Sequence, residues 1–293
     1  MAHIDLSGMG VALITPFKDD ESVDYEALIT MIDYLVDNET DYIVALGTTA
    51  ETISLTDDEK KEVTRLIVER VAGRIPIVLG VGGNCTHRIL KQVGNTCFNG
   101  IDAILSVVPY YNKPSQEGIY QHFKAIAQAS PLPVVLYNVP ARTVTNMTAE
   151  TTLRLAHEFD SVIAVKEASG NLTQIGEIIK NRPSGFQVIS GDDGLTLPMM
   201  AIGAEGVISV LGNAFPKDFS RMVHLALKGD FQKARSLHLR FTELFELLFV
   251  DGSPSGVKSL LNMLGLVENR LRLPLVPACA ATSEKIRNVL NKL

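Results

Sequence analysis

The sequence predicts a (β/α)8 barrel, also called a TIM barrel, followed by a C-terminal helical domain. Eight short apolar runs have the composition of buried strands, and segments with helical spacing separate them. Strand followed by helix, repeated eight times, is the pattern of a closed barrel with a filled interior. The expected strands cover residues 10–17, 42–47, 75–82, 102–109, 133–140, 162–169, 186–193 and 206–212.

Helix start signals lie between these strands. In each of them a Ser or Thr stands close before acidic residues, which the positive end of a helix dipole favours. The clearest signals are residues 22–26, 56–59, 115–117 and 148–150. A doubly wound open sheet is the alternative, but it would normally place a Gly-rich phosphate loop after its first strand. The turn here reads Thr15-Pro16-Phe17-Lys18, so the barrel is favoured.

The alternation of strands and helices ends after Lys228-Gly229-Asp230. We therefore divide the chain into a barrel over residues 1–229, which would carry the active site, and a helical appendage over 230–293. Helices are expected at 231–250, 256–264 and 283–293. The first of them has apolar residues along one side, which we expect to pack on the barrel as core. These residues are Phe231, Ala234, Leu237, Phe241, Leu244, Phe245 and Leu248.

The composition is that of a globular protein without a nucleic-acid or membrane partner. The chain has 293 residues, 46% of them apolar, and a formal net charge of -6. No basic cluster offers a nucleic-acid footprint. No apolar run approaches the roughly 18 residues that a membrane helix needs, and the N-terminal segment lacks a signal-peptide pattern. A cytoplasmic enzyme is therefore the expectation.

Neither a metal nor a nicotinamide cofactor is expected. The three cysteines, Cys85, Cys97 and Cys279, are too scattered for a CxxC metal site or a disulfide framework. The six histidines form neither an HxH nor an HExxH pattern. The glycines of Gly80-Val81-Gly82-Gly83 lack the spacing of a dinucleotide-binding loop.

One lysine, Lys166, lies inside the sixth expected strand. Lysine is costly to bury and depleted in strands, so its position needs a reason. Burial would lower the pKa of the amine, and only the neutral amine attacks carbonyls. Lys166 is therefore a candidate Schiff-base nucleophile; the alternative is a structural ion pair with a carboxylate on a neighbouring strand. Strand alternation predicts one face with Val162, Ala164, Lys166 and Ala168, and another with Ile163, Val165, Glu167 and Ser169.

Further candidates follow other strands, because catalytic groups in such a barrel come from the C-terminal strand ends and the loops after them. Thr48 and Thr49 follow the second strand with hydroxyls and amides that suit a carboxylate. Phenols for proton transfer follow the fourth strand and end the fifth, and a guanidinium comes after the fifth. The residues concerned are Tyr110, Tyr111, Tyr137 and Arg142, with Gly191-Asp192-Asp193 after the seventh strand.

Each of these residues also has a structural interpretation. Tyr137 could be a core aromatic residue, Arg142 a surface cation, and Thr48-Thr49 the cap of the next helix. Asp192-Asp193 suggests a metal site, but without nearby histidines a helix N-cap role is the better interpretation.

Together these stretches resemble the pyruvate-dependent Schiff-base aldolase and lyase family, and the similarity runs over essentially the whole chain. One departure is Ala50, where the family usually has glycine; the extra methyl group removes no chemical function. Four motifs at the expected strand ends carry the resemblance: Gly47-Thr48-Thr49-Ala50-Glu51, Pro109-Tyr110-Tyr111-Asn112-Lys113-Pro114, Tyr137-Asn138-Val139-Pro140-Ala141-Arg142-Thr143 and Lys166-Glu167-Ala168-Ser169-Gly170.

The resemblance implies roles for the catalytic residues. Lys166 would be the amine that condenses with pyruvate, and Tyr137 the proton donor and acceptor during imine formation. Thr48 would link Tyr137 to Tyr111, which would reach into the site of a neighbouring subunit. No cofactor would be needed, since the protonated imine is itself the electron sink.

The resemblance also implies the substrates and the assembly. Thr49 and the backbones of Gly191 and Ile208 would contact pyruvate. Arg142 would hold the carboxylate of the second substrate, L-aspartate 4-semialdehyde, in a step of lysine and diaminopimelate biosynthesis. Family members are usually homotetramers, so we expect a dimer of dimers.

Two other functions are compatible with part of the pattern. An N-acetylneuraminate lyase or a 2-keto-3-deoxy sugar acid aldolase would share Lys166 and Tyr137, but Thr48 and Arg142 favour the aspartate-semialdehyde reaction. A barrel that only senses a keto acid would not need the complete Lys, Tyr, Thr and Arg set.

Overall fold

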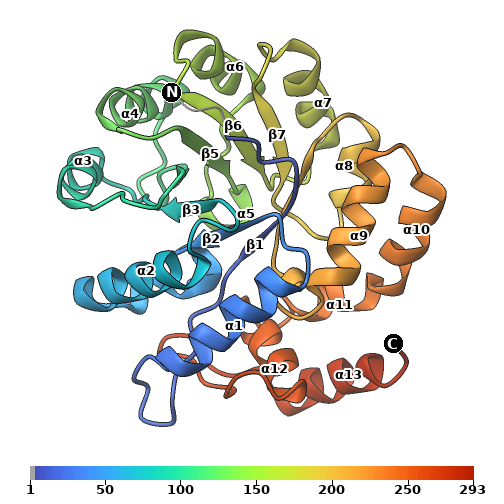
Figure 1. Cartoon of the computed structure of the whole chain (residues 1–293). Coiled ribbons are helices and arrows are strands. Elements are labelled where there is room, and N and C mark those ends of the chain that lie inside the picture. The colour runs from blue at the N-terminus through green and yellow to red at the C-terminus, as the bar shows by residue number, and fades with distance from the viewer. Residues whose placement is uncertain (1–3) are drawn as a thin grey trace.

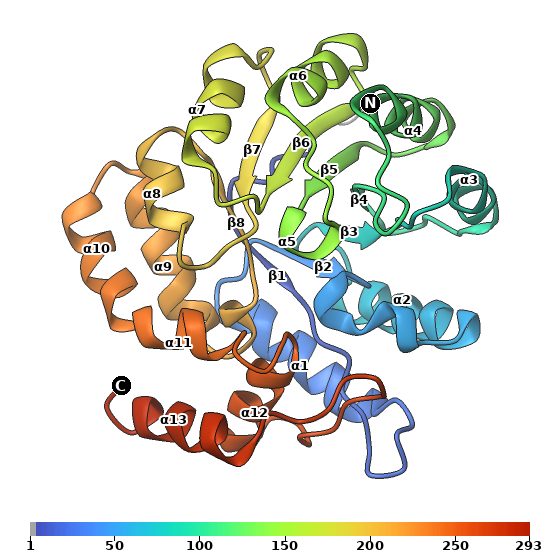
Figure 2. The same ribbon diagram turned by 180° about the vertical axis from the view of Figure 1, so that it is seen from behind.

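The structure, a computed structural model, describes residues 4–293 and contains a closed barrel of eight parallel strands (Figure 1 and Figure 2). Each strand pairs with the next, and the last pairs with the first, where Gly8 aligns with Gly206. All eight expected strands are present, so the predicted fold class is confirmed. They are β1 (Gly8–Ala12), β2 (Tyr42–Ala45), β3 (Ile77–Gly80), β4 (Ala103–Val107), β5 (Val134–Asn138), β6 (Val162–Glu167), β7 (Gln187–Ser190) and β8 (Gly206–Ser209).

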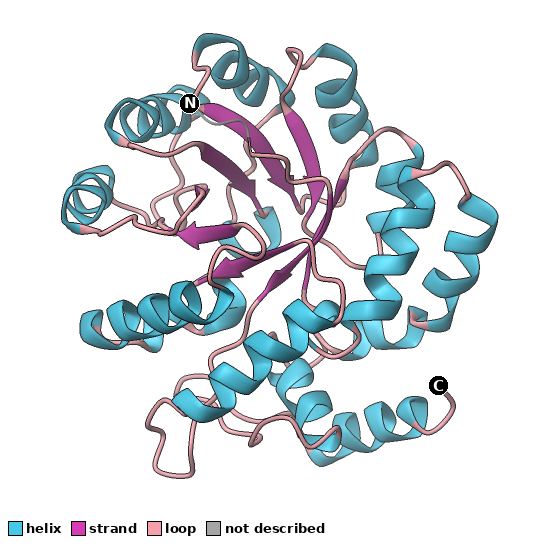
Figure 3. Ribbon diagram, viewed as in Figure 1, coloured by secondary structure: helices cyan, strands magenta, loops and turns pink. Residues whose placement is uncertain are grey.

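Helices cover the outside of the barrel (Figure 3). Across residues 4–293, none is long and apolar enough to span a lipid bilayer. The longer helices of the barrel region are α1 (Tyr25–Asp37), α2 (Asp57–Val71), α3 (Thr86–Asn95), α4 (Gln116–Ala129), α6 (Ala149–Glu158), α7 (Leu172–Asn181) and α9 (Pro216–Leu227). The shorter ones are α5 (Pro140–Thr143), α8 (Thr196–Ala201) and the 3-10 helices η1 (Thr48–Ala50), η2 (Thr52–Ser54) and η3 (Leu211–Asn213).

Side-chain caps begin four helices at the predicted signals. At α2, the Thr56 hydroxyl accepts a hydrogen bond from the Glu59 amide at 3.2 Å, and the Glu59 carboxylate accepts one from the Thr56 amide at 2.8 Å. Asp24, Ser115 and Thr148 each accept a hydrogen bond from the backbone amide three residues further on. These caps satisfy amides that have no partner inside the helix.

The first strand is shorter than expected, because β1 ends at Ala12 whereas the sequence suggested residues 10–17. The amide of Leu13 still pairs with β2, but the chain then turns and forms an isolated antiparallel bridge at Phe17. Residues 13–17 are nevertheless buried. The apolar run therefore indicated burial correctly and strand wrongly, since apolarity alone does not distinguish a strand from a buried loop.

Two layers of apolar side chains make the core. One cluster fills the barrel interior and includes Val44, Leu105 and Ala164. The other lies between the strands and the surrounding helices and includes Phe241 and Leu260 of the C-terminal segment. The C-terminal segment thus contributes to the core, as predicted.

The predicted strand alternation in β6 is correct from Ala164 onward and wrong before it. Ala164 belongs to the interior cluster, whereas Val162 packs in the outer cluster and Ile163 against the inner one. The reason is a register shift between Val134 and Val135, whose partners in β6 are Val162 and Ala164. Such a bulge adds one residue and reverses the alternation on one side of it.

The C-terminal segment contains α10 (Phe231–Arg240), α11 (Thr242–Leu247), α12 (Ser255–Met263) and α13 (Ala280–Leu290). The single helix expected over 231–250 is two helices that meet at Phe241. Its apolar side is buried at Phe241 and Leu244, but Phe231 is 36% exposed. The division of the chain into separate domains at residue 230 stays a prediction.

Gly206 is a position where a side chain would obstruct closure of the barrel. A Cβ atom there would lie 2.1 Å from the carbonyl oxygen of Gly8 on the neighbouring strand. We expect Gly206→Ala to lower the free energy of unfolding by about 2 kcal/mol or more, because the two backbones would have to separate. Urea unfolding followed by circular dichroism measures this change.

Gly176→Ala is the matched control, because Gly176 lies inside α7 with nothing within 4 Å of an added Cβ. It should raise the free energy of unfolding by about 0.5 kcal/mol, since alanine is the better helix former. Equal free energies of unfolding for Gly206→Ala and Gly176→Ala would contradict the importance of the close contact between Gly206 and Gly8.

Candidate active site

Lys166 lies near the C-terminal end of β6 and is only 7% exposed. The register of β5 and β6 places Tyr137 opposite it. The Lys166 Nζ lies 4.4 Å from the centroid of the Tyr137 ring. Among residues 4–293, no carboxylate oxygen lies within 4.0 Å of this Nζ. The alternative of a structural ion pair at Lys166 is therefore wrong.

Burial lowers the pKa of the Lys166 ammonium group from 10.5 to about 8. The Asp193 carboxylate opposes this shift, and the Arg142 guanidinium adds to it. With a pKa near 8, roughly a tenth of the amine is neutral at pH 7, about two orders of magnitude more than for an ordinary lysine. The neutral form of an amine is the one that attacks carbonyls, so this shift suits a nucleophile near neutral pH.

Tyr137 is both a core residue and a neighbour of the amine. It is 7% exposed and belongs to the interior cluster, so the core interpretation is correct as far as its ring is concerned. Burial raises the pKa of its hydroxyl, while the Arg142 charge and a hydrogen bond with the Thr48 hydroxyl lower it. The phenol therefore lies between the amine and the loop after β2.

Thr48 and Thr49 form the short helix η1 directly after β2. Thr49 is 5% exposed, whereas Thr48 is exposed at the mouth of the barrel. The interpretation of these two residues as a helix cap is wrong, because α2 begins at Asp57 and Thr56 caps it. Neither threonine is therefore the cap of α2.

Gly191 gives Lys166 the space that it needs. A Cβ atom at Gly191 would lie 2.8 Å from the Ala168 Cβ and 3.0 Å from the Lys166 Cε. Ile208, on β8, is 1% exposed and belongs to the same interior cluster as Tyr137. The structure thus brings β5, β6, β7 and β8 together around the lysine stem.

Asp193, a candidate at the end of the seventh strand for which the sequence favours a helix-cap role, belongs to this group. It is 4% exposed, and its Oδ2 accepts hydrogen bonds from the amides of Val210 at 3.1 Å and Leu211 at 2.7 Å. Burial raises the pKa of its carboxyl to about 6. Hydrogen bonds from the Leu211 amide and the Ser209 hydroxyl oppose this shift. Its position at the end of a barrel strand is the signal that selects it in the sequence, although a helix-cap role is the preferred interpretation there.

The helix-cap interpretation of Asp192-Asp193 is wrong for α8, since the residue at its N-cap is Leu195. Asp192 instead accepts hydrogen bonds from the amides of Gly194 and Leu195 and so closes the turn after β7. In residues 4–293, no three His, Cys, Asp or Glu side chains are grouped as a metal site would require.

Arg142 and Tyr111 are both exposed but differ in their relation to Lys166. Arg142, on α5, lies near enough for its charge to lower the pKa of Lys166 and of Tyr137. Tyr111 is 89% exposed, and its backbone has a φ of 75°, which is rare for a bulky residue. Its ring thus projects into solvent rather than toward the buried amine.

Glu167, the neighbour of Lys166, lies on the opposite face of β6 and is fully buried. Its carboxylate accepts hydrogen bonds from Asn138 Nδ2 at 3.1 Å, Gln174 Nε2 at 3.1 Å and the Ser169 amide at 2.8 Å. Burial raises the pKa of this carboxyl, and the hydrogen bonds oppose the shift. The bond to Asn138 joins β5 to β6 one residue beyond the pair of Tyr137 and Lys166.

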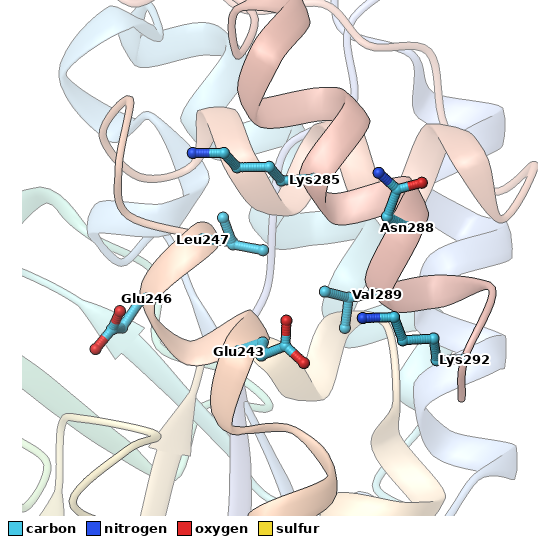
Figure 4. A pocket seen from close by; sticks show the side chains of 7 residues that line it. All are labelled: Glu243, Glu246, Leu247, Lys285, Asn288, Val289 and Lys292. Carbon is cyan, nitrogen blue, oxygen red and sulfur yellow. The ribbon is translucent and has the colours of Figure 1, made fainter.

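A surface pocket lies between α11 and α13, away from these residues (Figure 4). It is lined mainly by charged side chains, among them Glu243, Glu246, Lys285 and Lys292. No residue of the group around Lys166 lines it. The barrel mouth, and not this pocket, is therefore the candidate active site.

The fold and this group of residues define the class of (β/α)8-barrel enzymes with catalytic groups at the C-terminal ends of the strands. Within that class the chain belongs to the dihydrodipicolinate synthetase family, whose model matches residues 5–293. The resemblance inferred from the four motifs is thereby confirmed.

Individual relatives are similar over their whole length. The 4-hydroxy-tetrahydrodipicolinate synthase of Parabacteroides distasonis is 69% identical over 293 residues, which are 100% of this chain and 99% of that protein. The crystal structure of dihydrodipicolinate synthase from Aquifex aeolicus has a TM-score of 0.94 at 45% identity and covers 98% of both chains. A monomeric dihydrodipicolinate synthase variant has a TM-score of 0.95 at 38% identity, over 98% of this chain and 96% of that one.

The reactivity of Lys166 tests the electrostatics of the site. Cyanate carbamylates neutral amines, so modification of Lys166 should rise with pH through about 8. In Asp193→Asn the carboxylate that raises the pKa of Lys166 is absent, so this pKa should fall. The midpoint of the curve of Lys166 carbamylation against pH should therefore move to lower pH. Peptide mapping by mass spectrometry measures the extent of modification at each pH.

Asp192→Asn is the control, because Asp192 is exposed and its charge is not among the influences on the pKa of Lys166. Its midpoint should equal that of the wild type. A midpoint in Asp193→Asn that stays at the wild-type value, or rises, would contradict the assignment of Asp193 to the site.

Proposed function

We propose that this chain is a cytoplasmic lyase that condenses pyruvate with L-aspartate 4-semialdehyde to give 4-hydroxy-tetrahydrodipicolinate, a step of lysine and diaminopimelate biosynthesis. The observation that carries the proposal is the buried amine of Lys166, with its pKa lowered to about 8 and its Nζ 4.4 Å from the Tyr137 ring centroid. Membership of the family and the name of the relative with 69% identity support the choice of substrates.

The reaction begins when the neutral Lys166 amine attacks the C2 carbonyl of pyruvate. Tyr137 donates a proton to the hydroxyl group of the resulting carbinolamine, which leaves as water and gives a protonated imine. Thr48 passes protons between Tyr137 and Tyr111. The hydrogen bond between Thr48 and the Tyr137 hydroxyl supports the first part of this relay.

The positive imine then acidifies the methyl group of pyruvate, which loses a proton to give an enamine. The enamine carbon attacks the aldehyde carbon of the second substrate, forming a carbon–carbon bond and a hydroxyl group. The amine of that substrate displaces Lys166 and closes the ring, which regenerates the free lysine. The protonated imine accepts the electron pair of the methyl C–H bond, and the enamine donates that pair when it forms the carbon–carbon bond, so this route needs no metal or nicotinamide.

The substrates occupy different depths of the mouth. Thr49 and the backbones of Gly191 and Ile208 bind pyruvate, and the burial of Thr49 and Ile208 suits a small first substrate that is enclosed. Arg142 binds the carboxylate of L-aspartate 4-semialdehyde, since a guanidinium can bind a carboxylate with two parallel hydrogen bonds. The exposure of Arg142 suits a group that meets the second substrate at the rim.

The enzyme assembles as a homotetramer, a dimer of dimers, in which Tyr111 completes the site of a neighbouring subunit. A left-handed backbone at a non-glycine residue costs about 1 kcal/mol or more, and within one chain the exposed Tyr111 ring gains no burial in return. A contact with a second subunit would supply the missing burial. The monomeric variant among the structural relatives indicates that the fold itself does not require assembly.

Lys166→Ala should lower kcat by more than about 1,000-fold, because the imine forms on the amine that this substitution removes. The assay couples turnover of pyruvate and L-aspartate 4-semialdehyde to the next enzyme of the pathway. Treatment with pyruvate and borohydride should add the reduced adduct to Lys166 in the wild type. Lys180→Ala, which removes an exposed lysine of α7, should keep both activity and labelling.

Turnover by Lys166→Ala would rule out the imine mechanism. So would a wild-type enzyme whose mass does not increase after treatment with pyruvate and borohydride. Cleavage of N-acetylneuraminate at a higher kcat/KM than the synthase reaction would favour the sialate lyase instead.

A mixture of two inactive variants tests the shared site. Tyr111→Phe keeps Lys166 but loses the donated hydroxyl, whereas Lys166→Ala keeps Tyr111. Hybrid oligomers would contain sites with both residues, so mixing the two variants under conditions of subunit exchange should restore part of the activity. No recovery in hybrids whose formation is shown by native mass spectrometry would mean that Tyr111 does not act across subunits.

A further inference from the structure

A buried ion pair joins the C-terminal segment to the loop that follows β2. The Lys258 Nζ, on α12, lies 2.5 Å from the Glu51 Oε1, and neither side chain has any exposed surface. The two residues are 207 positions apart in the chain. Glu51 directly follows η1, the short helix that contains Thr48 and Thr49.

Each partner of this pair is held by further contacts with the C-terminal segment. The Lys258 Nζ also donates to the carbonyl oxygen of Arg270 at 2.8 Å and lies 4.2 Å from the centroid of the Phe17 ring. The Glu51 Oε2 accepts a hydrogen bond from the Arg272 amide at 3.1 Å. The Arg272 guanidinium lies 4.7 Å from the same Phe17 centroid. The loop after β2 is therefore fixed from outside the barrel.

The backbone of Glu51 needs this support. Its φ is 52°, in the left-handed region that side chains other than glycine rarely adopt. The preceding residue, Ala50, is 2% exposed, and its carbonyl accepts a hydrogen bond from the Thr15 hydroxyl at 2.8 Å. Without Lys258, the Glu51 carboxylate would be a buried charge that keeps, within the described residues, only the hydrogen bond from the Arg272 amide. The cost of burying that charge would favour a displacement of the loop after β2.

Stability alone is a weak reason for such a pair. Removing two charges from water is costly, and a buried ion pair often contributes no more to stability than apolar residues of the same shape. A fixed geometry is a better reason, because a displacement of about 1 Å in a positioning group can reduce a rate by roughly a hundredfold. The groups next to Glu51 that would be displaced are Thr48 and Thr49.

We propose that Glu51 and Lys258 are positioning residues, through which the C-terminal segment holds Thr48 and Thr49 at the mouth of the barrel. This inference rests on the proposed function, because it assumes that Thr48 serves Tyr137 and that Thr49 binds pyruvate. Neither Glu51 nor Lys258 touches a substrate. The C-terminal segment thereby contributes to catalysis by positioning these two threonines, in addition to packing on the barrel.

The test is the variant Glu51→Gln/Lys258→Met, which removes both charges together and leaves no unpaired ion. Activity is expressed per site that pyruvate and borohydride label at saturation, so unfolded enzyme does not enter the rate. We expect kcat/KM for pyruvate to fall about 10-fold or more. Glu51→Gln alone, which keeps the shape of the side chain, should show a fall in the same direction if the double variant does not fold.

Arg240→Met is the matched control. Arg240, on α10, also joins the C-terminal segment to the barrel, through Asp218 at 3.0 Å, but it does not contact the loop after β2. Its kcat/KM should stay within about twofold of the wild type, as expected for a surface ion pair.

A double-mutant cycle with Thr48→Val separates positioning from general stability. If the pair acts through Thr48, removing the pair in the Thr48→Val background should lower kcat/KM less than about twofold. If the pair has an independent structural effect, its removal should lower kcat/KM by the same factor in both backgrounds. Suppose that pyruvate and borohydride label Lys166 in the wild type and that kcat/KM is unchanged in Glu51→Gln/Lys258→Met. This result would overturn the positioning role and leave the proposed function intact. A wild type that does not label would overturn the proposed function.

Discussion

Closure of the barrel between β1 and β8 is the constraint on which the rest of the structure depends. At this seam Gly8 faces Gly206, and the two backbones approach so closely that a Cβ atom at Gly206 would lie 2.1 Å from the Gly8 carbonyl oxygen. Since every neighbouring pair of strands is parallel, all eight C-terminal ends meet at one rim. Residues from β2, β5, β6, β7 and β8 become neighbours there, although long stretches of chain separate them. An open sheet of the same strands would leave Thr48 remote from Ile208.

The register of β5 and β6 is the next determinant of the site. A slip of one residue would turn Lys166 outward and bring Glu167 into the barrel, because successive side chains of a strand point in opposite directions. The outer network of Glu167, Asn138 and Gln174 opposes such a slip through buried hydrogen bonds. The position of the Lys166 amine on the inner face is therefore supported by the hydrogen bonds of a carboxylate on the outer face. Burial raises the pKa of that carboxyl and lowers the pKa of the amine beside it in sequence.

The C-terminal segment is connected to this arrangement at the loop after β2. Its helices contribute apolar side chains to the outer cluster, and Lys258 binds Glu51 inside the protein. The site thus has two kinds of support. The strands fix Lys166 and Tyr137 directly, whereas the loop that carries Thr48 is held from a segment outside the barrel. Loops are the more mobile part of such barrels, so a loop that contributes to a site is held in place by contacts such as the ion pair of Glu51 and Lys258.

The sequence alone was sufficient for the fold class and the four capped helix starts, because strand period and cap residues are local properties of the chain. It also singled out Lys166, whose burial the structure shows and whose catalytic role stays a prediction. It misjudged the face of Val162, since the bulge responsible arises from pairing with β5. It suggested Asp193 as a helix cap rather than as a neighbour of Lys166, and it gave no indication that Glu51 pairs with Lys258. Burial, pKa and ion pairing depend on groups that approach from distant parts of the chain. Only the closed tertiary structure decides which of those groups meet.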